Sequence, residues 1–190
     1  MGKDVRAGLL EAALELMAAR GYEGVGVQEV AAAARVSKPA LYHYFGSKKG
    51  LLATLLLEGS GPFLETLRAE AAYDGDLPQT LDRVAGVYLT FAARNPVFYR
   101  LQLGLLFTPP ESEAREPATR LFVRQQEILE QLFQAAVRDH GNMRGRKQRY
   151  AYAFLGVLNA YAALIVDGGA RPTDRMRREL VHQFSHGIYS

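Results

Sequence analysis

The stretch that decides the fold is residues 37–48, which read Ser-Lys-Pro-Ala-Leu-Tyr-His-Tyr-Phe-Gly-Ser-Lys. It begins like a helix, because Ser37 can cap an N-terminus and Pro39 fits the first turn, where a proline loses no needed hydrogen bond. Leu41 and Phe45 stand four residues apart, so both are expected to face the core of a short helix at about 38–44. The side chains left to face outward are those of Lys38, Tyr42, His43 and Tyr44.

Positive charge is concentrated in and beside this stretch. Residues 35–49 hold four cations and no acid, whereas residues 1–34 hold three cations and five acids. The whole chain has a formal net charge of only +3, which alone would not indicate a partner. Because phosphates bind where cations are focused, the local concentration predicts a phosphate-binding surface. Its cations are Arg35, Lys38, Lys48 and Lys49.

The elements around residues 37–48 complete a recognisable arrangement. The pattern predicts a longer helix at about 3–20, closed by Gly21 as a left-handed C-cap, then a short helix at about 27–34 and a tight turn. Two short helices joined by a tight turn and braced by a longer helix describe a helix-turn-helix, whose second helix enters the major groove of DNA. Polar-tipped rings there can contact base edges and phosphates, while Lys48 adds an ammonium at the N-terminus of the next helix.

Motifs at consistent spacing run without a gap through this whole region. They read Leu10-Glu11-Ala12-Ala13-Leu14-Glu15-Leu16, Gly21-Tyr22, Val27-x-x-Val30-Ala31, Ala34-x-Val36-Ser37-Lys38 and Leu41-Tyr42-His43-Tyr44-Phe45-x-Ser47-Lys48. Residues 9–52 therefore resemble the N-terminal domain of TetR-type bacterial transcription regulators. Two positions depart from that family's pattern. Gly26 replaces the hydroxyl residue that usually caps the second helix, and Arg35 replaces a common turn glycine, which adds strain of about 1 kcal/mol if Arg35 is left-handed.

The resemblance implies a homodimer whose two recognition helices enter successive major grooves of double-stranded DNA at a near-palindromic operator. It also implies a C-terminal domain that binds a small-molecule effector and thereby weakens DNA binding, with repression as the usual mode. On this basis residues 1–47 form the DNA-binding domain, and residues 48–190 form the ligand-binding and dimerisation domain. The DNA contacts implied by position are Gln28, Ser37, Lys38, Pro39, Tyr42, His43, Tyr44 and Lys48.

The remainder of the chain is also predicted to be helical, so the fold class is all-α with about nine helices. No strand pattern of useful length occurs, and a hydrophobic content of 48% is enough for a sizeable core. The helix that starts at residue 48 is expected to end or kink at Gly59, Gly61 and Pro62. Further helices are expected at about 76–94, 96–107, 117–140, 144–167 and 174–189.

Aromatic and aliphatic side chains cluster in the middle of the chain, where they could line a cavity for a small apolar or aromatic ligand. Core packing is the competing explanation for each ring. The candidates are Tyr88, Phe91, Phe98, Tyr99, Leu103, Phe107, Phe122 and Tyr152.

The last two long helices resemble the pair that joins two subunits of the family in a four-helix bundle. The alternative is that both belong to the core of a monomer. The interface residues expected from their apolar faces are Tyr150, Phe154, Leu158, Tyr161, Leu180, Phe184 and Ile188.

Other classes of protein find little support. The chain has no cysteine, no glycine-rich phosphate loop, no GxSxG and no HExxH, so we expect neither an enzyme nor a cofactor. His182 and His186 have a spacing that could hold a metal, but no third ligand is evident, and no metal site is predicted. The N-terminus lacks a signal peptide and no uninterrupted apolar run reaches membrane length, which predicts a cytoplasmic protein without a membrane partner. A helical adaptor that binds another protein is the competing binding function.

Overall fold

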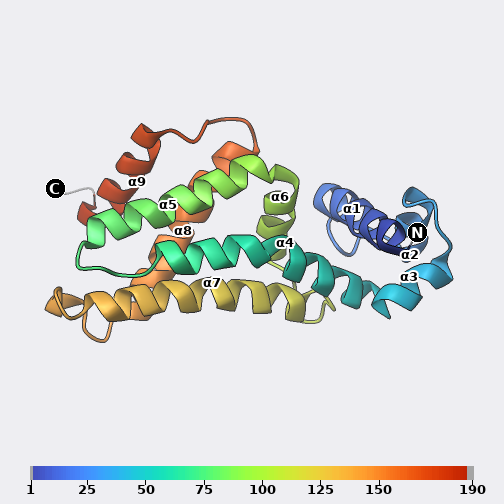
Figure 1. Ribbon diagram of the computed structural model, residues 1–190, viewed down its shortest axis with the longest axis horizontal. Helices are drawn as coiled ribbons and strands as arrows, with labels where there is room; N and C mark the ends of the chain where they lie inside the picture. The colour runs from blue at the N-terminus through green and yellow to red at the C-terminus, as the bar shows by residue number, and fades with distance from the viewer. Residues whose placement is uncertain (1, 188–190) are drawn as a thin grey trace. The chain divides into compact units, whose positions relative to one another are not determined.

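The computed structural model of the 190-residue chain describes residues 2–187. This part of the chain contains nine α-helices, one short 3₁₀ helix and no strand, which confirms the predicted all-α class (Figure 1). The helices are α1 (Gly2–Arg20), α2 (Val27–Ala33), α3 (Lys38–Phe45), α4 (Lys48–Glu70), α5 (Leu77–Arg94), α6 (Pro96–Leu105), α7 (Arg115–Ala136), α8 (Lys147–Val166) and α9 (Asp174–His186), with the 3₁₀ helix at Gly141–Met143.

The helices divide by their contacts into two compact units. The first unit contains the chain up to Ser60 together with Val97–Leu121, and the second contains Gly61–Pro96 together with the chain from Phe122 onward. The division therefore falls inside α4, and α6 belongs mainly with the N-terminal helices. This division differs from the boundary predicted between residues 47 and 48. The predicted boundary separates a DNA-binding segment from a ligand-binding and dimerisation segment, and it stays a prediction.

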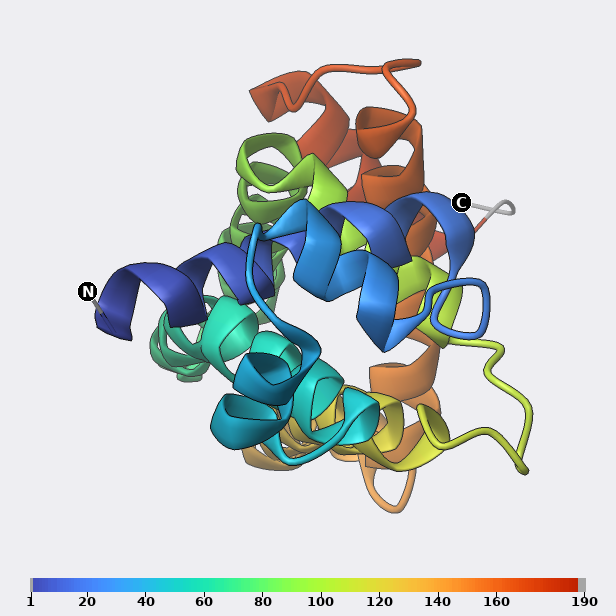
Figure 2. The same cartoon turned by 90° about the vertical axis from the view of Figure 1, so that its right-hand side faces the viewer.

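In the first unit, α1 and α3 pack with α2 into a three-helix module (Figure 2). Leu9, Ala13 and Met17, which stand four residues apart on α1, contribute to its core, where all three are almost fully buried. Gly21 ends α1 with a φ of 73°, in the left-handed conformation that its position predicted. The module is thus built around α1, with Val30 of α2 and Leu41 of α3 completing the core.

The course of α4 corrects one prediction. Gly59, Gly61 and Pro62 were expected to end or kink this helix, yet α4 continues through all three. Gly59 has a packing role, since a Cβ added there would lie 2.3 Å from Cε2 of the Phe98 ring. Pro62 costs the helix one hydrogen bond, to the carbonyl of the exposed Glu58, which water can reach.

In the second unit, α5 packs against both α8 and α9. Tyr88 of α5, Phe154 of α8 and Leu180 of α9 are fully buried there. Among the described residues, α8 is the one helix long and apolar enough to cross a membrane by length and composition. The core helix of a folded domain meets the same criterion, and α8 is partly buried, with Phe154, Leu158 and Ala162 among its buried residues.

Candidate nucleic-acid interface and ligand region

The recognition helix α3 is fixed by its ends and by its inner face. The backbone N–H of Ala40 donates to Oγ of Ser37 over 3.4 Å, so Ser37 caps the helix as predicted. Leu41 is fully buried and Phe45 nearly so. Gly46 ends α3 with a φ of 72°. These contacts hold the outer face of α3 in one orientation relative to α1 and α2.

The outer face of α3 carries the side chains that the sequence predicted. Lys38, Pro39 and His43 are exposed, Tyr42 is 42% exposed, and Tyr44 is half-buried. Nζ of Lys38 lies 5.8 Å from the centroid of the Tyr42 ring, within range of a cation–π contact. The Tyr44 ring meets the His43 ring edge to face at 5.3 Å. One short helix thus carries an ammonium, an imidazole and two phenols. Gln28 is exposed on α2.

The turn before α3 contains the departures noted in the sequence. Arg35 has a φ of 57°, so it occupies the left-handed region that usually takes glycine. The expected strain of about 1 kcal/mol therefore applies, and in return the turn gains a cation. Gly26 is the N-cap of α2 and makes no side-chain cap hydrogen bond.

The N-terminus of α4 distinguishes its two lysines. Ser47 caps the helix, because its Oγ accepts from the N–H of Gly50 over 2.9 Å. Nζ of Lys48, in the first turn of α4, lies 4.0 Å from the centroid of the Tyr22 ring, within range of a cation–π contact. Lys49 instead forms an ion pair with Glu116 of α7. Lys48 thus lies against an aromatic ring, whereas Lys49 is paired with an acid, and the phosphate contact of Lys48 stays a prediction.

The loop between α6 and α7 contacts the helices that carry this surface. The Tyr22 hydroxyl donates to Oε2 of Glu113 over 3.2 Å, and burial together with this carboxylate raises the pKa of Tyr22 above its usual value. Oγ of Ser112 donates to Glu23. Sequence reasoning did not find these contacts, because the residues are about 90 positions apart and no local pattern relates them.

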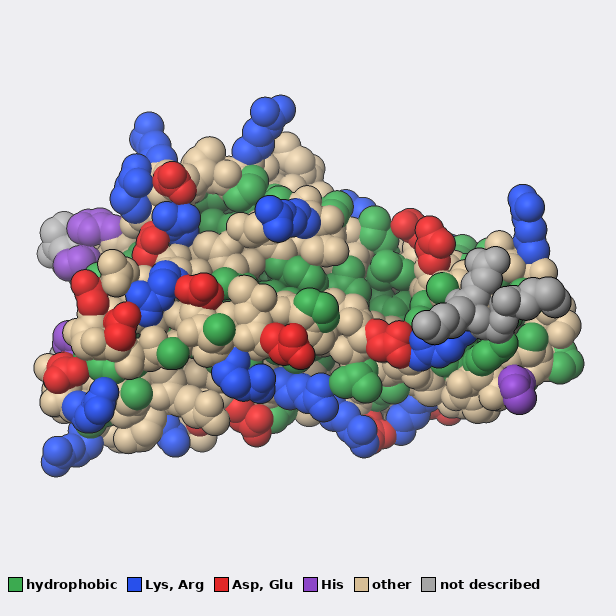
Figure 3. Space-filling view, viewed as in Figure 1, with side chains coloured by type: hydrophobic (Ala, Val, Ile, Leu, Met, Phe, Trp, Pro, Cys, Tyr) green, Lys and Arg blue, Asp and Glu red, His purple; other side chains and the backbone are tan. Residues whose placement is uncertain are grey.

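Charges of both signs mix on the face of the molecule that Figure 3 shows, where lysine and arginine side chains are interspersed with aspartate and glutamate. The candidate interface is therefore defined by the outer face of α3 and the start of α4, and a uniformly basic surface is not what defines it. It can bind a polyanion that presents base edges in a groove about as wide as a helix.

The predicted ligand-lining residues are distributed over both units. In the first unit Phe98 and Tyr99 are buried and Leu103 is half-buried. Phe107 corrects the prediction, because it is 90% exposed, beyond the end of α6 at Leu105. In the second unit Tyr88 is buried, Phe91 and Phe122 are half-buried, and Tyr152 is 61% exposed on the outer face of α8, which is a second correction.

Rings of the second unit largely pack on one another. Phe63 stacks on Phe91 with centroids 4.5 Å apart and meets Tyr88 edge to face at 5.0 Å. The Tyr88 hydroxyl donates to Oε1 of Gln125 over 3.0 Å. Core packing, the competing explanation in the sequence, therefore accounts for Tyr88.

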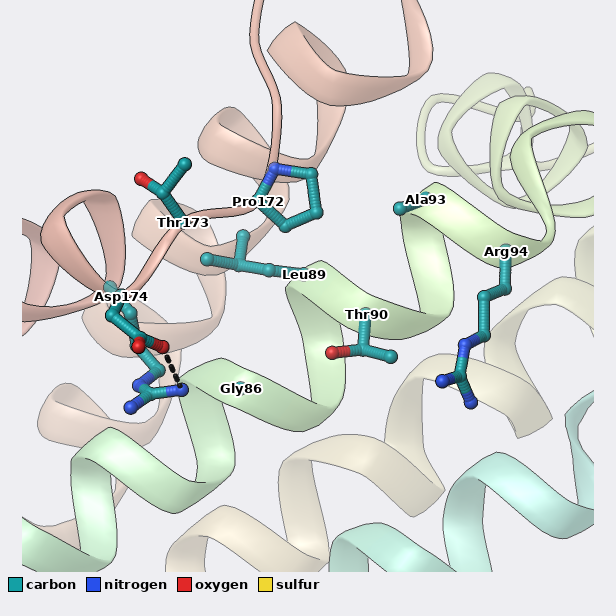
Figure 4. Close-up of a pocket in the computed structure, with 9 residues that line it drawn as sticks. Gly86, Leu89, Thr90, Ala93, Arg94, Pro172, Thr173 and Asp174 are labelled. Carbon is teal, nitrogen blue, oxygen red and sulfur yellow. Dashed lines mark ion pairs between the residues drawn. The ribbon is translucent and has the colours of Figure 1, made fainter.

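Two surface pockets lie within the second unit. One, of about 300 Å³, is bordered by α5 and by the segment that leads into α9 (Figure 4). Its Arg177 is already paired with Asp82 at 2.8 Å and with Asp174 at 3.2 Å, which neutralises its charge. The other, of about 380 Å³, is lined by aromatic and histidine side chains that the sequence did not assign to a ligand site. Those side chains are Phe133, His140, Tyr150, Phe184 and His186.

The predicted interface residues on α8 and α9 have mixed burial. Phe154, Leu158 and Leu180 are fully buried within the subunit, so a partner could not touch them without rearrangement, and their assignment to the interface needs correction. Tyr150, Tyr161 and Phe184 are half-buried, and Ile188 lies outside the described residues. His182 and His186 stack with centroids 4.4 Å apart, and residues 2–187 hold no group of three potential metal ligands. The outer face of α8 instead presents Tyr152, Ala153, Gly156, Ala160 and Leu164.

Residues 9–55, which include the whole helix-turn-helix, match the family described as bacterial regulatory proteins, tetR family. Over these residues the chain is therefore similar to TetR-family regulators.

Known proteins show similarity at two levels. The transcriptional regulator AcuR of Cereibacter sphaeroides is 39% identical over 69 residues, which cover 36% of this chain and 31% of AcuR. The match to this relative thus spans about a third of its length. The HTH-type transcriptional activator FasR of Mycolicibacterium smegmatis is 28% identical over 156 residues, covering 82% of this chain and 69% of FasR. The crystal structure of the regulator FadR from Bacillus subtilis with stearoyl-CoA shares the fold, with a TM-score of 0.80, 18% identity, and coverage of 96% and 99%.

Proposed function

We propose that this protein is a cytoplasmic, homodimeric transcriptional repressor that leaves a near-palindromic operator when a small, largely apolar effector binds to it. The observation that carries the proposal is the outer face of α3 beside Lys48. There α3, which is capped by Ser37 and buried on its inner face, presents Lys38, Tyr42, His43 and Tyr44. The ammonium of Lys48 lies in the first turn of α4. Side chains of this kind on a helix of this length fit a major groove and its flanking phosphates.

An acyl-CoA is the effector class that we infer. Support comes from the fold shared with FadR, which was solved with stearoyl-CoA. The buried aromatic and aliphatic side chains of α6 suit an acyl chain. The relative FasR is described as an activator, so similarity alone does not decide between repression and activation. Repression, and release by the effector, are therefore proposals.

The first experiment tests DNA binding. The purified protein should shift a fragment from the DNA upstream of its own gene and protect a near-palindromic site within it. Because the contacts are largely to phosphates, the affinity should fall steeply as salt rises from about 50 to 200 mM. No shift of that fragment or of genomic DNA at low salt would contradict a DNA-binding function and favour the helical adaptor.

The homodimer is proposed to form through the outer face of α8. Tyr152, Gly156, Ala160 and Leu164 lie four residues apart, so they form one exposed stripe of apolar and small side chains. Small residues let a second helix approach closely, and a two-fold partner would supply the second recognition helix.

Replacing Ala160 with glutamate should therefore convert the dimer to a monomer, since it places a charge in the centre of this stripe. Sedimentation or light scattering measures the mass, and operator affinity should fall with it. Gln131→Glu, on the exposed side of α7, is the matched control and should leave the dimer intact. A dimer that survives Ala160→Glu would show that another face joins the subunits.

A further inference from the structure

Gln102 of α6 stands out among the polar residues of the interior. Its side chain is fully buried, and neither Nε2 nor Oε1 has a hydrogen-bond partner among the described residues. A buried amide without partners destabilises the folded state, and native proteins rarely keep one. Both a donor and an acceptor are therefore held in the first unit with their hydrogen-bonding capacity unused.

Among the described residues, the other buried polar side chains have hydrogen-bond partners. Ser60 donates to the carbonyl of Leu56 over 2.6 Å, and Thr80 donates to that of Asp76 over 2.7 Å. Gln125 is a direct comparison, because it is also fully buried but its Oε1 accepts from the Tyr88 hydroxyl over 3.0 Å. Gln102 is thus the exception among the buried polar side chains of the described residues, because it lacks a hydrogen-bond partner.

The surroundings of Gln102 restrict the group that it could bind. Its neighbours on the same side of α6, Phe98, Tyr99 and Leu105, are apolar or aromatic and buried. Arg100 is the only charged residue of α6, and its side chain is exposed. A carboxylate brought to Gln102 would be a buried charge opposite a neutral amide, which is costly. A neutral group that offers both an acceptor and a donor fits without that cost.

We propose that Gln102 is the polar contact of the effector site and that it binds the thioester end of an acyl-CoA. The side-chain N–H would donate to the thioester carbonyl, and Oε1 would accept from the amide N–H of the adjoining thiol arm. The inference rests on the acyl-CoA class proposed above and assigns its recognition to one residue. It also distinguishes the thioester from the free acid, which has the same chain but a charged end.

Gln102 is placed to affect the DNA-binding surface from within the first unit. Phe98, four residues earlier on α6, has its ring against Gly59 of α4, where a Cβ would not fit. At the other end, α6 leads into the loop whose Glu113 accepts from Tyr22, the ring under Lys48. Ligand binding at Gln102 can therefore displace α4 through Phe98, and it can displace the loop after α6 that contacts Tyr22. Both α4 and Tyr22 position Lys48, and tightly packed contacts transmit such displacements.

The test measures stability and ligand affinity in the full-length protein and in three variants: Gln102→Leu, Gln102→Met and Gln125→Leu. Loss of an unpaired amide should raise the melting temperature in both Gln102 variants, whereas Gln125→Leu should lower it by leaving the Tyr88 hydroxyl without its acceptor. The probes are stearoyl-CoA below its micelle concentration, stearic acid, and CoA alone. Stearoyl-CoA should bind the wild type more tightly than either other probe, and both Gln102 variants should bind it about tenfold more weakly or worse.

Three outcomes would overturn the inference. Unchanged stearoyl-CoA affinity in Gln102→Met and Gln102→Leu would show that Gln102 is not the contact. Equal binding of stearic acid and stearoyl-CoA would exclude recognition of the thioester, and no binding of stearoyl-CoA would exclude the class. Operator binding by the free proteins is measured in the same samples. Its failure would overturn the proposed DNA-binding function, whereas intact operator binding with any of the three outcomes overturns only the effector inference.

Discussion

Replacing Lys48 with alanine is expected to weaken operator binding by about tenfold to a hundredfold while changing the melting temperature little. Lys48 is the cation that the Tyr22 ring holds at the N-terminus of α4, where free backbone N–H groups already favour a phosphate. Each lost phosphate contact lowers the slope of log affinity against log salt by about 0.9, so a dimer should lose about 2 from that slope. The loss should be similar for all sequences, because phosphates carry no base information.

Lys49→Ala is the matched control for this prediction. It removes the same charge one residue later, but Lys49 is paired with Glu116 on α7. Its operator affinity and salt slope should change much less than those of Lys48→Ala. Equal losses in the two variants would mean that net charge, and not the position of Lys48, controls binding. Fluorescence anisotropy with a labelled operator at several salt concentrations measures both quantities.

Replacing Gly59 with alanine is expected to destabilise the protein, although alanine favours a helix. The added Cβ would lie 2.3 Å from Cε2 and 2.7 Å from Cδ2 of the buried Phe98 ring. Overpacking of this kind costs about 1–3 kcal/mol, against a gain of about 1 kcal/mol in helix propensity. We expect a net loss of up to about 2 kcal/mol, which corresponds to a fall in melting temperature of up to roughly 8 °C for a chain of this size.

Gly8→Ala in the middle of α1 is the control. A Cβ at Gly8 meets nothing within 4 Å, so this substitution should stabilise the protein by about 0.5–1 kcal/mol. Phe98→Leu should in turn relieve the cost of Gly59→Ala, since it removes the atoms that clash. Thermal unfolding of the four proteins checks the account, and equal effects of the two glycine substitutions would contradict it.

The recognition helix could be predicted in detail because its signals are local. The cap at Ser37, the four-residue spacing of Leu41 and Phe45, and the turn at Gly46 all act within a few residues. The same spacing determined which side chains of α3 face outward. The left-handed conformation of Arg35 was raised only as a condition, because the resembled family commonly has a turn glycine at that position.

Other features depended on contacts that no local pattern contains. Gly59 was interpreted as a helix breaker, because the sequence does not show that Phe98 packs against it. Phe107 and Tyr152 were grouped with the ligand-lining rings by composition, although one lies beyond the end of α6 and the other on an outer face. The periodicity of α8 marks apolar positions but cannot tell a subunit core from a subunit interface. The unpaired amide of Gln102 is visible only when every neighbour is in place.

The central claim is that one protein binds operator DNA and an acyl-CoA in competition. Its most direct test is a titration of labelled operator with and without stearoyl-CoA, paired with a titration of stearoyl-CoA with and without operator. Coupled sites must weaken each other by the same factor, and we expect that factor to be about 5 to 150. Unchanged operator affinity in saturating stearoyl-CoA, with stearoyl-CoA bound, would contradict the account.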